Sequence, residues 1–267
     1  MNKKIGFIGV GNMATAIIGG MLESKFCAPE NINIHDFDID KCNYFASKGV
    51  TVCNSNEDVT NSSDIIVVAV KPQNYAEVLQ SLSTLDLKDK TFVSIAAGIS
   101  IAFVREQLKC DVKVVRVMPN TPLLLSKGAT ALCPSSDMSD EDFEPVRAMF
   151  ALGGVVETFD ESHMNEIISV NGSSPAYVYL FAKAMVQYAA ECGIDSDKAL
   201  NLICATFEGA AAMMKESGDD IDTLISKVSS KGGTTLEALS TFRENNFEEI
   251  VKDAMKACTK RAEELGK

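Results

Sequence analysis

A glycine-rich string near the start of the chain constrains the fold most. Gly9-Val10-Gly11-Asn12-Met13-Ala14 follows an apolar run, Ile5–Ile8, that predicts a strand, and it opens a segment, Thr15–Glu23, that predicts a helix. In this context the first glycine permits a tight turn, the second lets a pyrophosphate approach the backbone, and the alanine lets helix and strand pack closely. Because the helix N-terminus also offers free N–H groups, the string predicts a dinucleotide site. A glycine-rich connection without a ligand is the alternative.

Short apolar runs alternate with helix-like segments through the first half of the chain, which is the pattern of βαβ units and a parallel sheet. One run, Ile65–Val70, is continuously apolar, as in a central strand that is buried on both faces. Helices are therefore expected on both sides of the sheet. The expected strands are Ile5–Ile8, Ile32–His35, Ile65–Val70, Phe92–Ile95 and Val112–Val117.

The character of the chain changes at about Asp160, where strand-like runs end and segments rich in Ala, Met, Leu, Lys and Glu begin. We therefore expect two domains. Residues 1–160 should form an α/β domain with a Rossmann-type doubly wound parallel sheet, and residues 161–267 an all-α dimerisation domain. Its first helix, Ser162–Cys192, should bend near Pro175. The further helices are expected from Asp195/Ser196 to about Ser217, over Asp219–Lys227, and twice between Thr234 and Lys267.

One helical segment of the second half, Ala205–Met214, is hydrophobic around its whole circumference. Such a helix is not stable on the surface of a single chain, so we expect it to be buried against another subunit. The segment therefore predicts a homodimer at least.

The composition excludes several classes of function. The 267 residues carry a net charge of −12 without a cluster of basic residues, so a nucleic-acid partner is not expected. No stretch approaches the roughly 20 apolar residues that span a bilayer, and the start of the chain lacks the pattern of a signal peptide, so we expect a cytoplasmic protein without membrane contact. The eight cysteines are scattered singly, with only His35 and His163 as imidazole partners, so no metal site is expected.

An acidic residue, Asp36, lies at the end of the second expected strand. A carboxylate at this place can accept hydrogen bonds from the hydroxyls of an adenosine ribose, which favours NADH over NADPH. The nearby Asp38 and Asp40 add negative charge, and no arginine follows Asp36 to hold a 2'-phosphate. The alternative is that the three aspartates form a solvated turn.

Two further segments end expected strands at the edge where ligands of doubly wound sheets bind. Lys71 follows the third expected strand, where it could contact a cofactor phosphate or a substrate carboxylate, although an exposed lysine before a proline is equally common. The small residues of Ser94-Ile95-Ala96-Ala97-Gly98 would let a flat nicotinamide lie against the backbone.

A loop in the helical half has the character of an anion site. Ser229-Ser230-Lys231-Gly232-Gly233-Thr234-Thr235 leads into an expected helix, Leu236–Arg243, so its N–H groups lie at a positive helix end and suit a carboxylate. The alternative is an ordinary capping loop in which Thr234 is the N-cap.

Several strings together resemble the pyrroline-5-carboxylate reductase family, and the resemblance covers nearly the whole chain. The first alone indicates only dinucleotide binding, whereas the last resembles a signature of this family. The strings are Gly6–Ala14, Ala69–Gln73, Ser94–Gly98, Arg116–Pro122, Pro175–Tyr177 and Val228–Thr235.

The resemblance implies reduction of a cyclic imine, 1-pyrroline-5-carboxylate, to L-proline by NADH or NADPH. It also implies a helical domain that interlocks with its twin into a homodimer, often within a ring of dimers. Thr235 would be the catalytic residue, with its hydroxyl facing the ring nitrogen. The implied substrate-binding residues are Ser230, Gly233, Thr234 and Thr235. The implied cofactor-binding residues, together with Asp36, are Gly9, Gly11, Asn12 and Met13 at the pyrophosphate, Asn56 at the adenosine, and Val70, Lys71, Pro72, Ala97 and Gly98 at the nicotinamide end.

The chain departs from the family pattern at Lys231, which stands where the family usually has a proline. Two other functions would fit the same two-domain pattern. A related two-domain 3-hydroxyacid or imine dehydrogenase would need a catalytic lysine early in its first long helix, and Ser162–Tyr179 contains none. A non-catalytic dinucleotide-binding scaffold would have no need of the loop that ends at Thr235.

Overall fold

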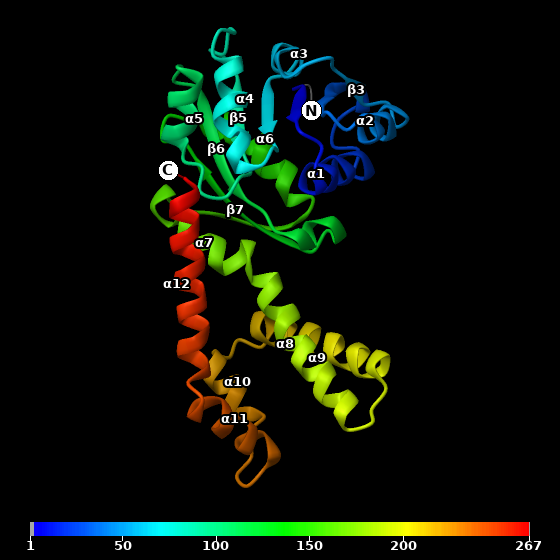
Figure 1. Cartoon of the computed structure of the whole chain (residues 1–267), viewed down its shortest axis with the longest axis vertical. Coiled ribbons are helices and arrows are strands. Elements are labelled where there is room, and N and C mark those ends of the chain that lie inside the picture. Colours follow the sequence, from blue (N-terminus) through cyan, green and yellow to red (C-terminus); the bar gives the residue numbers. More distant parts are fainter. Residues whose placement is uncertain (1–2, 267) are drawn as a thin grey trace. The chain divides into compact units, whose positions relative to one another are not determined.

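The computed structural model describes residues 3–266, which pack into two compact units (Figure 1). One unit contains the chain up to Pro175 together with the residues from Lys256 onward, and the other is Ala176–Met255. Packing therefore divides the chain some fifteen residues after the expected boundary, and it assigns the end of the last helix to the first unit. The expected domains, 1–160 and 161–267, stay a prediction.

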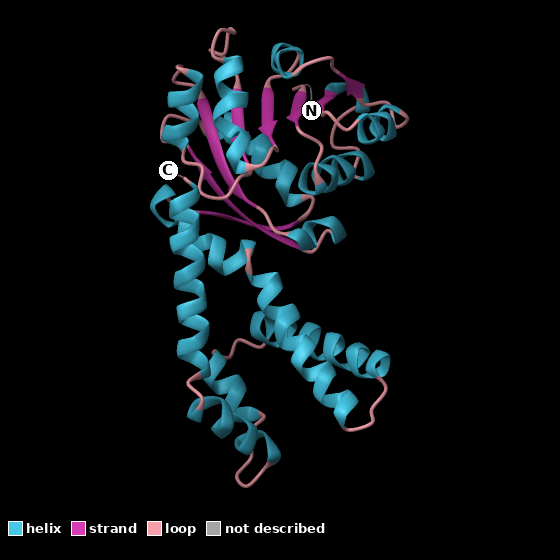
Figure 2. Ribbon diagram, viewed as in Figure 1, coloured by secondary structure: helices cyan, strands magenta, loops and turns pink. Residues whose placement is uncertain are grey.

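The first unit is built on one eight-stranded sheet, drawn in magenta in Figure 2, with the order β3-β2-β1-β4-β5-β6-β7-β8. The first six strands pair in parallel and follow the 3-2-1-4-5-6 order of a Rossmann fold, which confirms the expected fold class. The strands are β1 Ile5–Ile8, β2 Ile32–His35, β3 Thr51–Val52, β4 Ile65–Val68, β5 Thr91–Ser94, β6 Lys113–Met118, β7 Gly128–Pro134 and β8 Gly154–Thr158.

Three of these strands were not expected from the sequence. β3 has only two residues, and β7 and β8 mix glycine, alanine and polar residues with few apolar ones, so neither shows a continuous apolar run. β7 also pairs antiparallel to β6, so the sheet is not parallel throughout. β4 ends at Val68, two residues before the expected end.

Helices cover both faces of the sheet, as expected. Within β4, Ile65 and Val67 join the apolar core on one face, while Ile66 and Val68 join the core on the other. Full burial of each such side chain contributes about 1.5–3 kcal/mol, so a strand buried on both faces is strongly fixed in its register. The helices on the first face are α1 Asn12–Glu23, α2 Ile39–Ala46 and α6 Asp140–Ala151, and those on the second are α3 Asn56–Asn61, α4 Tyr75–Leu82 and α5 Ile101–Leu108.

The expected bend near Pro175 is an interruption of the helix. α7 Met164–Ile167 continues into a π-helical turn, Ile168–Gly172, before α8 Ser174–Glu191 begins. Proline lacks the N–H that would bond the carbonyl four residues earlier, at Asn171. The Asn120 side chain, on the loop after β6, donates to that carbonyl at 3.1 Å instead. The break is therefore stabilised by a specific partner.

The second unit is helical and contains the expected elements: α8, α9 Ser196–Glu216, α10 Ile221–Lys227, α11 Thr234–Glu244 and the first part of α12 Phe247–Leu265. Asp195 caps α9 by accepting a bond from the Lys198 amide at 3.0 Å. Four phenylalanines, Phe181, Phe207, Phe242 and Phe247, form an aromatic cluster among its helices. The last residue, Lys267, lies outside the described residues.

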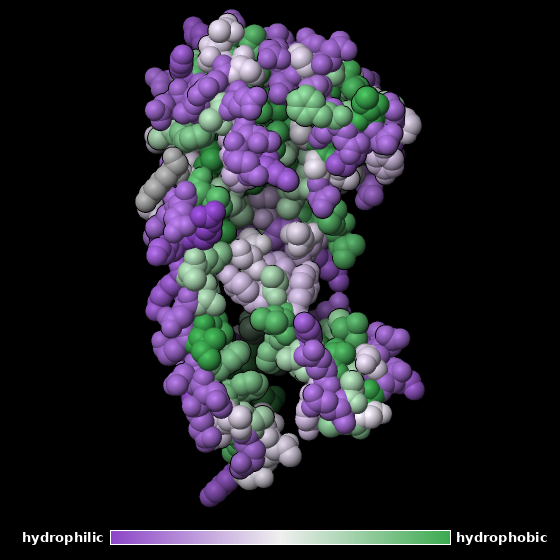
Figure 3. Space-filling model, in the orientation of Figure 1, coloured by the Kyte–Doolittle hydropathy of each residue, from purple (hydrophilic) through white to green (hydrophobic). Residues whose placement is uncertain are grey.

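Much apolar surface of the second unit faces outward. Figure 3 shows hydrophobic surface among its helices. Along α9, Leu202 is 71% exposed, and Met213 and Met214 are each more than half exposed. The expected burial of Ala205–Met214 is thus not provided by the chain itself. No helix of the described residues is long and apolar enough to span a membrane.

Candidate dinucleotide site and carboxylate loop

The turn after β1 requires glycine at its first position. Gly9 has a φ of +90°, and a Cβ on it would lie 3.0 Å from the Ala69 carbonyl oxygen at the end of β4. The Gly9 amide donates to the His35 carbonyl at 2.8 Å, which ties the turn to the end of β2. A Cβ on Gly11 would meet no atom within 4 Å, so the space beside it is open to a ligand.

The N-terminus of α1 is suited to a phosphate. Gly11 is the N-cap without a side-chain cap, and Thr15 makes the first bond of the helix by donating to the Gly11 carbonyl at 2.9 Å. The amides from Gly11 to Ala14 therefore have no partner inside the helix. No acidic residue lies in the first turn. Unpaired amides at the positive end of a helix are an anion site, and they fit a pyrophosphate.

A pocket of about 500 Å³ opens beside this turn. Its volume is in the range of small-molecule sites, roughly 300–1,000 Å³. It lies at the ends of β1 and β4, which is the topological switch point of a Rossmann sheet. Of the residues expected at the cofactor, the pocket brings together Gly9, Gly11, Asp36, Asn56, Val70 and Lys71; Asn12, Met13, Pro72, Ala97 and Gly98 are not among its lining residues.

The carboxylate of Asp36 lines the pocket and also holds the glycine turn. One oxygen accepts from the Val10 amide at 2.5 Å and the other from the Asp38 amide at 2.8 Å. Each oxygen keeps a further lone pair that a ribose hydroxyl could use. Asp38 has a local role: it caps α2 and forms an ion pair with Lys41, and the hydrogen bond from Lys41 lowers its pKa.

Several lining residues were missed by the sequence analysis. His35 and Phe37 flank Asp36, and the Asn56 Oδ1 lies 2.8 Å from the His35 Nδ1. Glu77 and Ser81 come from α4. The position of His35 at the carboxyl end of a strand was a usable signal, whereas the α4 residues belong to no motif.

Lys71 follows β4 and lines the pocket with an exposed side chain. Among the described residues its ammonium group has no hydrogen-bonded or ion-paired partner, while its carbonyl accepts from the Asn74 amide at 2.9 Å. A buried side chain holds the end of β4 in place. The Tyr75 hydroxyl donates to the Val68 carbonyl at 2.5 Å and accepts from the Ser94 hydroxyl at 3.3 Å. Burial raises the pKa of Tyr75, so the hydroxyl stays protonated and remains a donor.

The small residues after β5 serve packing at one position. Gly98 is buried with a φ of +82°, and a Cβ on it would overlap the Ala262 carbonyl oxygen in the last turns of α12. The glycine therefore makes room for a helix. Ala97, beside it, is partly exposed. The placement of both residues at the nicotinamide end stays a prediction.

The loop before α11 lies in the second unit. Gly232 has a φ of +71°, and Gly233 is the N-cap of α11 with no side-chain cap. The alternative in which Thr234 caps the helix is wrong, because α11 begins at Thr234, two residues before the expected start. Within the described part of the chain, neither the Thr234 nor the Thr235 hydroxyl has a hydrogen-bond partner. The loop thus presents helix N-terminal amides together with two free hydroxyls, and such amides suit a carboxylate.

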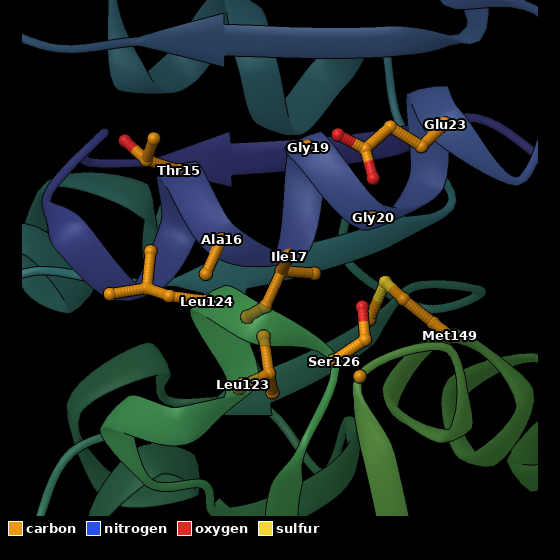
Figure 4. Close-up of a pocket in the computed structure, with 11 residues that line it drawn as sticks. Thr15, Ala16, Ile17, Gly19, Gly20, Glu23, Leu123, Leu124, Ser126 and Met149 are labelled. Carbon is orange, nitrogen blue, oxygen red and sulfur yellow. The ribbon is translucent and has the colours of Figure 1, made fainter. Parts of the chain in front are cut away.

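A second hollow, shown in Figure 4, lies between α1 and the loop after β6, where Leu123 and Leu124 face Ala16 and Ile17. Its volume of about 120 Å³ is too small for a dinucleotide. Nowhere in residues 3–266 do three or more His, Cys, Asp or Glu side chains gather to hold a metal ion.

Two family models match the chain. Residues 4–98 match NADP oxidoreductase coenzyme F420-dependent, and residues 161–265 match Pyrroline-5-carboxylate reductase dimerisation. The chain is 36% identical over 268 residues to pyrroline-5-carboxylate reductase of Escherichia coli K12, with 100% of each chain covered. It is 37% identical over 271 residues to the same enzyme of Pasteurella multocida, with 99% of this chain and 98% of the relative covered.

Solved structures agree. The crystal structure of Plasmodium falciparum pyrroline carboxylate reductase with NADP bound superposes with a TM-score of 0.92 at 29% identity, covering 100% of this chain and 99% of that one. A pyrroline-5-carboxylate reductase from Coxiella burnetii gives a TM-score of 0.91 at 30% identity, with both chains fully covered.

Proposed function

The chain belongs to the pyrroline-5-carboxylate reductase family, and we infer that it reduces 1-pyrroline-5-carboxylate to L-proline by hydride transfer from a nicotinamide dinucleotide. The observation that carries this function is the 36% identity with the E. coli enzyme over the full length of both chains. The enzyme is an oxidoreductase that acts on a C=N bond. Its substrate is a small carboxylated imine, and the reaction is the last step of proline biosynthesis.

The residues of this chain position the reactants. The cofactor supplies the hydride when bound, and an imine carbon is already electrophilic, so no strong acid–base pair is needed. The amides of Gly11 to Ala14 hold the pyrophosphate, and the pocket beside Asp36 holds the adenosine half. Orienting the reacting atoms to within about 3–3.5 Å supplies much of the acceleration.

For the substrate, the loop before α11 holds the carboxylate on the amides that follow Gly233. The Thr235 hydroxyl donates to the imine nitrogen or relays a proton to it. This assignment is supported by the free N-terminus of α11 and by the absence of a protein partner for that hydroxyl among the described residues. A Thr235→Val change should lower kcat/KM for the imine about 100-fold, the lower end of the usual range for general acid catalysis.

The matched control for Thr235 is Thr241→Val on the same helix, where the hydroxyl bonds only to the Glu237 carbonyl. Thr235→Ser keeps the hydroxyl and should retain most of the activity. Wild-type kcat/KM in Thr235→Val would remove Thr235 from the reaction.

We also propose that NADH is preferred to NADPH, because the Asp36 carboxylate repels a 2'-phosphate in the adenosine part of the pocket. The ratio of kcat/KM for NADH to that for NADPH should exceed one, and Asp36→Ser should reduce it at least tenfold. Asp36 also holds the glycine turn through the Val10 amide, and a loosened turn would lower kcat/KM for both cofactors alike. The ratio of the two values is therefore insensitive to that loss. Asp40→Ser, in the exposed first turn of α2, is the control and should leave the ratio unchanged. A ratio below one in the wild type would refute the preference.

The experiment that tests the function follows the oxidation of NADH and NADPH at 340 nm with five- and six-membered cyclic imino acids. The five-membered imine should be reduced, with L-proline as the product by chromatography. No turnover with either cofactor would favour a non-catalytic dinucleotide-binding scaffold.

We propose that the helical domain forms a homodimer, and that such dimers can assemble further into rings. The support is the matched dimerisation domain and the exposed apolar side chains of α9. A cytoplasmic location stays a prediction from the sequence.

A further inference from the structure

The adenosine part of the pocket contains one contact between side chains that the proposed mechanism does not use. His35 is the last residue of β2, and Asn56 is the first residue of α3. The His35 Nδ1 lies 2.8 Å from the Asn56 Oδ1, and both residues line the pocket together with Asp36. The two side chains come from segments that are 21 positions apart.

The chemistry of this contact fixes two orientations at once. The oxygen of an asparagine amide only accepts, so with Oδ1 facing the ring the contact is a hydrogen bond when the Nδ1 of His35 carries the proton. The Asn56 amide then directs its NH2 group away from the imidazole. Among residues 3–266, no atom accepts a hydrogen bond from that NH2 group. Two donors are therefore left for a ligand in the pocket.

The surroundings of both residues hold the contact in place. The His35 carbonyl accepts from the Gly9 amide at 2.8 Å, and the His35 ring meets Phe37 edge-on with a centroid distance of 5.6 Å. On the other side, the Thr60 hydroxyl donates to the Asn56 carbonyl at 2.8 Å, and Ser55 caps α3. These bonds fix the main chain at His35 and Asn56, while the ring contact with Phe37 and the contact with Asn56 orient the His35 side chain.

We propose that His35 is a positioning residue that holds the Asn56 amide with its NH2 group directed at an acceptor atom of the adenosine half of the cofactor. The proposal rests on the proposed function only in that the ligand is a nicotinamide dinucleotide. It assigns to His35 a role in cofactor affinity and none in the chemical step. Loss of His35 therefore raises KM for the cofactor and leaves kcat unchanged.

The test is a double-mutant cycle on binding, with no turnover required. The Kd of NADH is measured from the fluorescence of its reduced nicotinamide for wild type, His35→Phe, Asn56→Ala and the double variant. Phenylalanine keeps a ring against Phe37 and removes the donor. Each single change should weaken binding about tenfold, and the double variant should be no weaker than the weaker single one. If the two losses of affinity multiplied in the double variant, the side chains would act independently and the proposal would be overturned. Unchanged binding of NADH by His35→Phe would overturn it as well.

Two further variants separate positioning from folding. His35→Asn places an amide nitrogen near the position of Nδ1 and should restore binding to within a few-fold of the wild type. His163→Phe changes the other histidine of the chain, which does not line this pocket, and should bind NADH as the wild type does. If His35→Asn bound no better than a well-folded His35→Phe, the hydrogen bond would not be the cause.

The tautomer of His35 distinguishes hydrogen bonding from packing, because a ring that only packed would not need its proton on Nδ1. In 15N-histidine-labelled protein at pH 8, His35 should be the Nδ1–H tautomer, with the His163→Phe variant providing the assignment. An Nε2–H tautomer would overturn the proposal, because Nδ1 could not then donate to Asn56. Failure of the imine assay with an intact binding cycle would reject the reductase function and leave this inference standing.

Discussion

At the scale of single residues, the site depends on groups that hold backbone in place. The carboxylate of Asp36 accepts from the Val10 and Asp38 amides, so it shapes the glycine turn as well as the charge of the pocket. Tyr75 acts in the same way at the ends of β4 and β5. A substitution at either position therefore acts on geometry, and its effect on a ligand is partly indirect.

The Tyr75 hydroxyl gives a prediction about stability. In Tyr75→Phe the buried Val68 carbonyl loses its side-chain donor and Ser94 loses an acceptor. An unsatisfied buried polar group costs about 1–3 kcal/mol, so the free energy of unfolding in urea should fall by that amount. Tyr44→Phe, at a residue that is 53% exposed, is the control and should change stability by less than about 0.5 kcal/mol. Equal effects of the two changes would contradict the assigned role.

Cys133 gives a prediction about pH. Burial raises its pKa to about 11 from an ordinary value of 9.0. A thiol with a higher pKa in the folded state binds its proton more tightly there, so its contribution to stability is full below pH 9 and is lost as the pH rises through 11. Between pH 8 and pH 11 the wild type should lose about 2 kcal/mol more than Cys133→Ala in urea unfolding. Parallel pH profiles for the two proteins would show that Cys133 is ionised equally in both states.

The glycine turn was predictable from the sequence because its requirements are local. The φ of Gly9, the open space at Gly11 and the burial of Ala14 all follow from a strand, a turn and a helix that are consecutive in the chain. Glu77 and Ser81 were not, because their place in the pocket depends on how α4 packs. Local pattern therefore predicted the glycine turn and missed the pocket residues that tertiary packing places there.

At the scale of elements, the same small residues can make room for a ligand or for a helix. The sequence around Gly98 predicts space for a nicotinamide, which stays a prediction, and the structure shows that Gly98 makes room for the last turns of α12. The contact with α12 could not be predicted from a local string, because α12 lies far along the chain. In the same way, Pro175 predicted a bend, but only the structure shows that Asn120 satisfies the Asn171 carbonyl.

The contact between Gly98 and α12 can be tested against a matched glycine. Gly98 and Gly193 have nearly the same φ, +82° and +78°, but a Cβ on Gly193 would meet no atom within 4 Å. Gly193→Ala should cost about 1 kcal/mol from backbone strain, while Gly98→Ala should cost at least about 2 kcal/mol more from the clash with Ala262. Thermal or urea unfolding measures both. Similar losses would mean that α12 does not pack on this loop.

At the scale of the whole molecule, the second unit exposes many large apolar side chains, such as Leu180, Leu202 and Met213. The family match to a dimerisation domain, from residue 161 to 265, covers the whole of this unit. In the proposed homodimer a second copy of the chain covers this surface, and its burial would supply the hydrophobic stabilisation that the isolated helices lack.

Leu202 on α9 tests the assembly. Its side chain is 71% exposed in the single chain, and Leu202→Asp would place a charge in the proposed dimer interface. We expect sedimentation equilibrium to show a smaller species for this variant than for the wild type. Leu125→Asp, at a residue of the first unit that is 78% exposed, is the control and should leave the mass unchanged. An unchanged mass for Leu202→Asp would place the interface elsewhere.

The return of the chain to the first unit at Lys256 has a consequence for dissecting the enzyme. Met164, Ile168 and Ala262 are buried in the apolar core that covers one face of the sheet. A fragment cut after residue 160, at the domain boundary predicted from the sequence, would lack all three residues. That face of the sheet would then be left partly uncovered. Such a fragment should precipitate on expression, and limited proteolysis of the intact enzyme near its last helix should weaken nucleotide binding far from the cut.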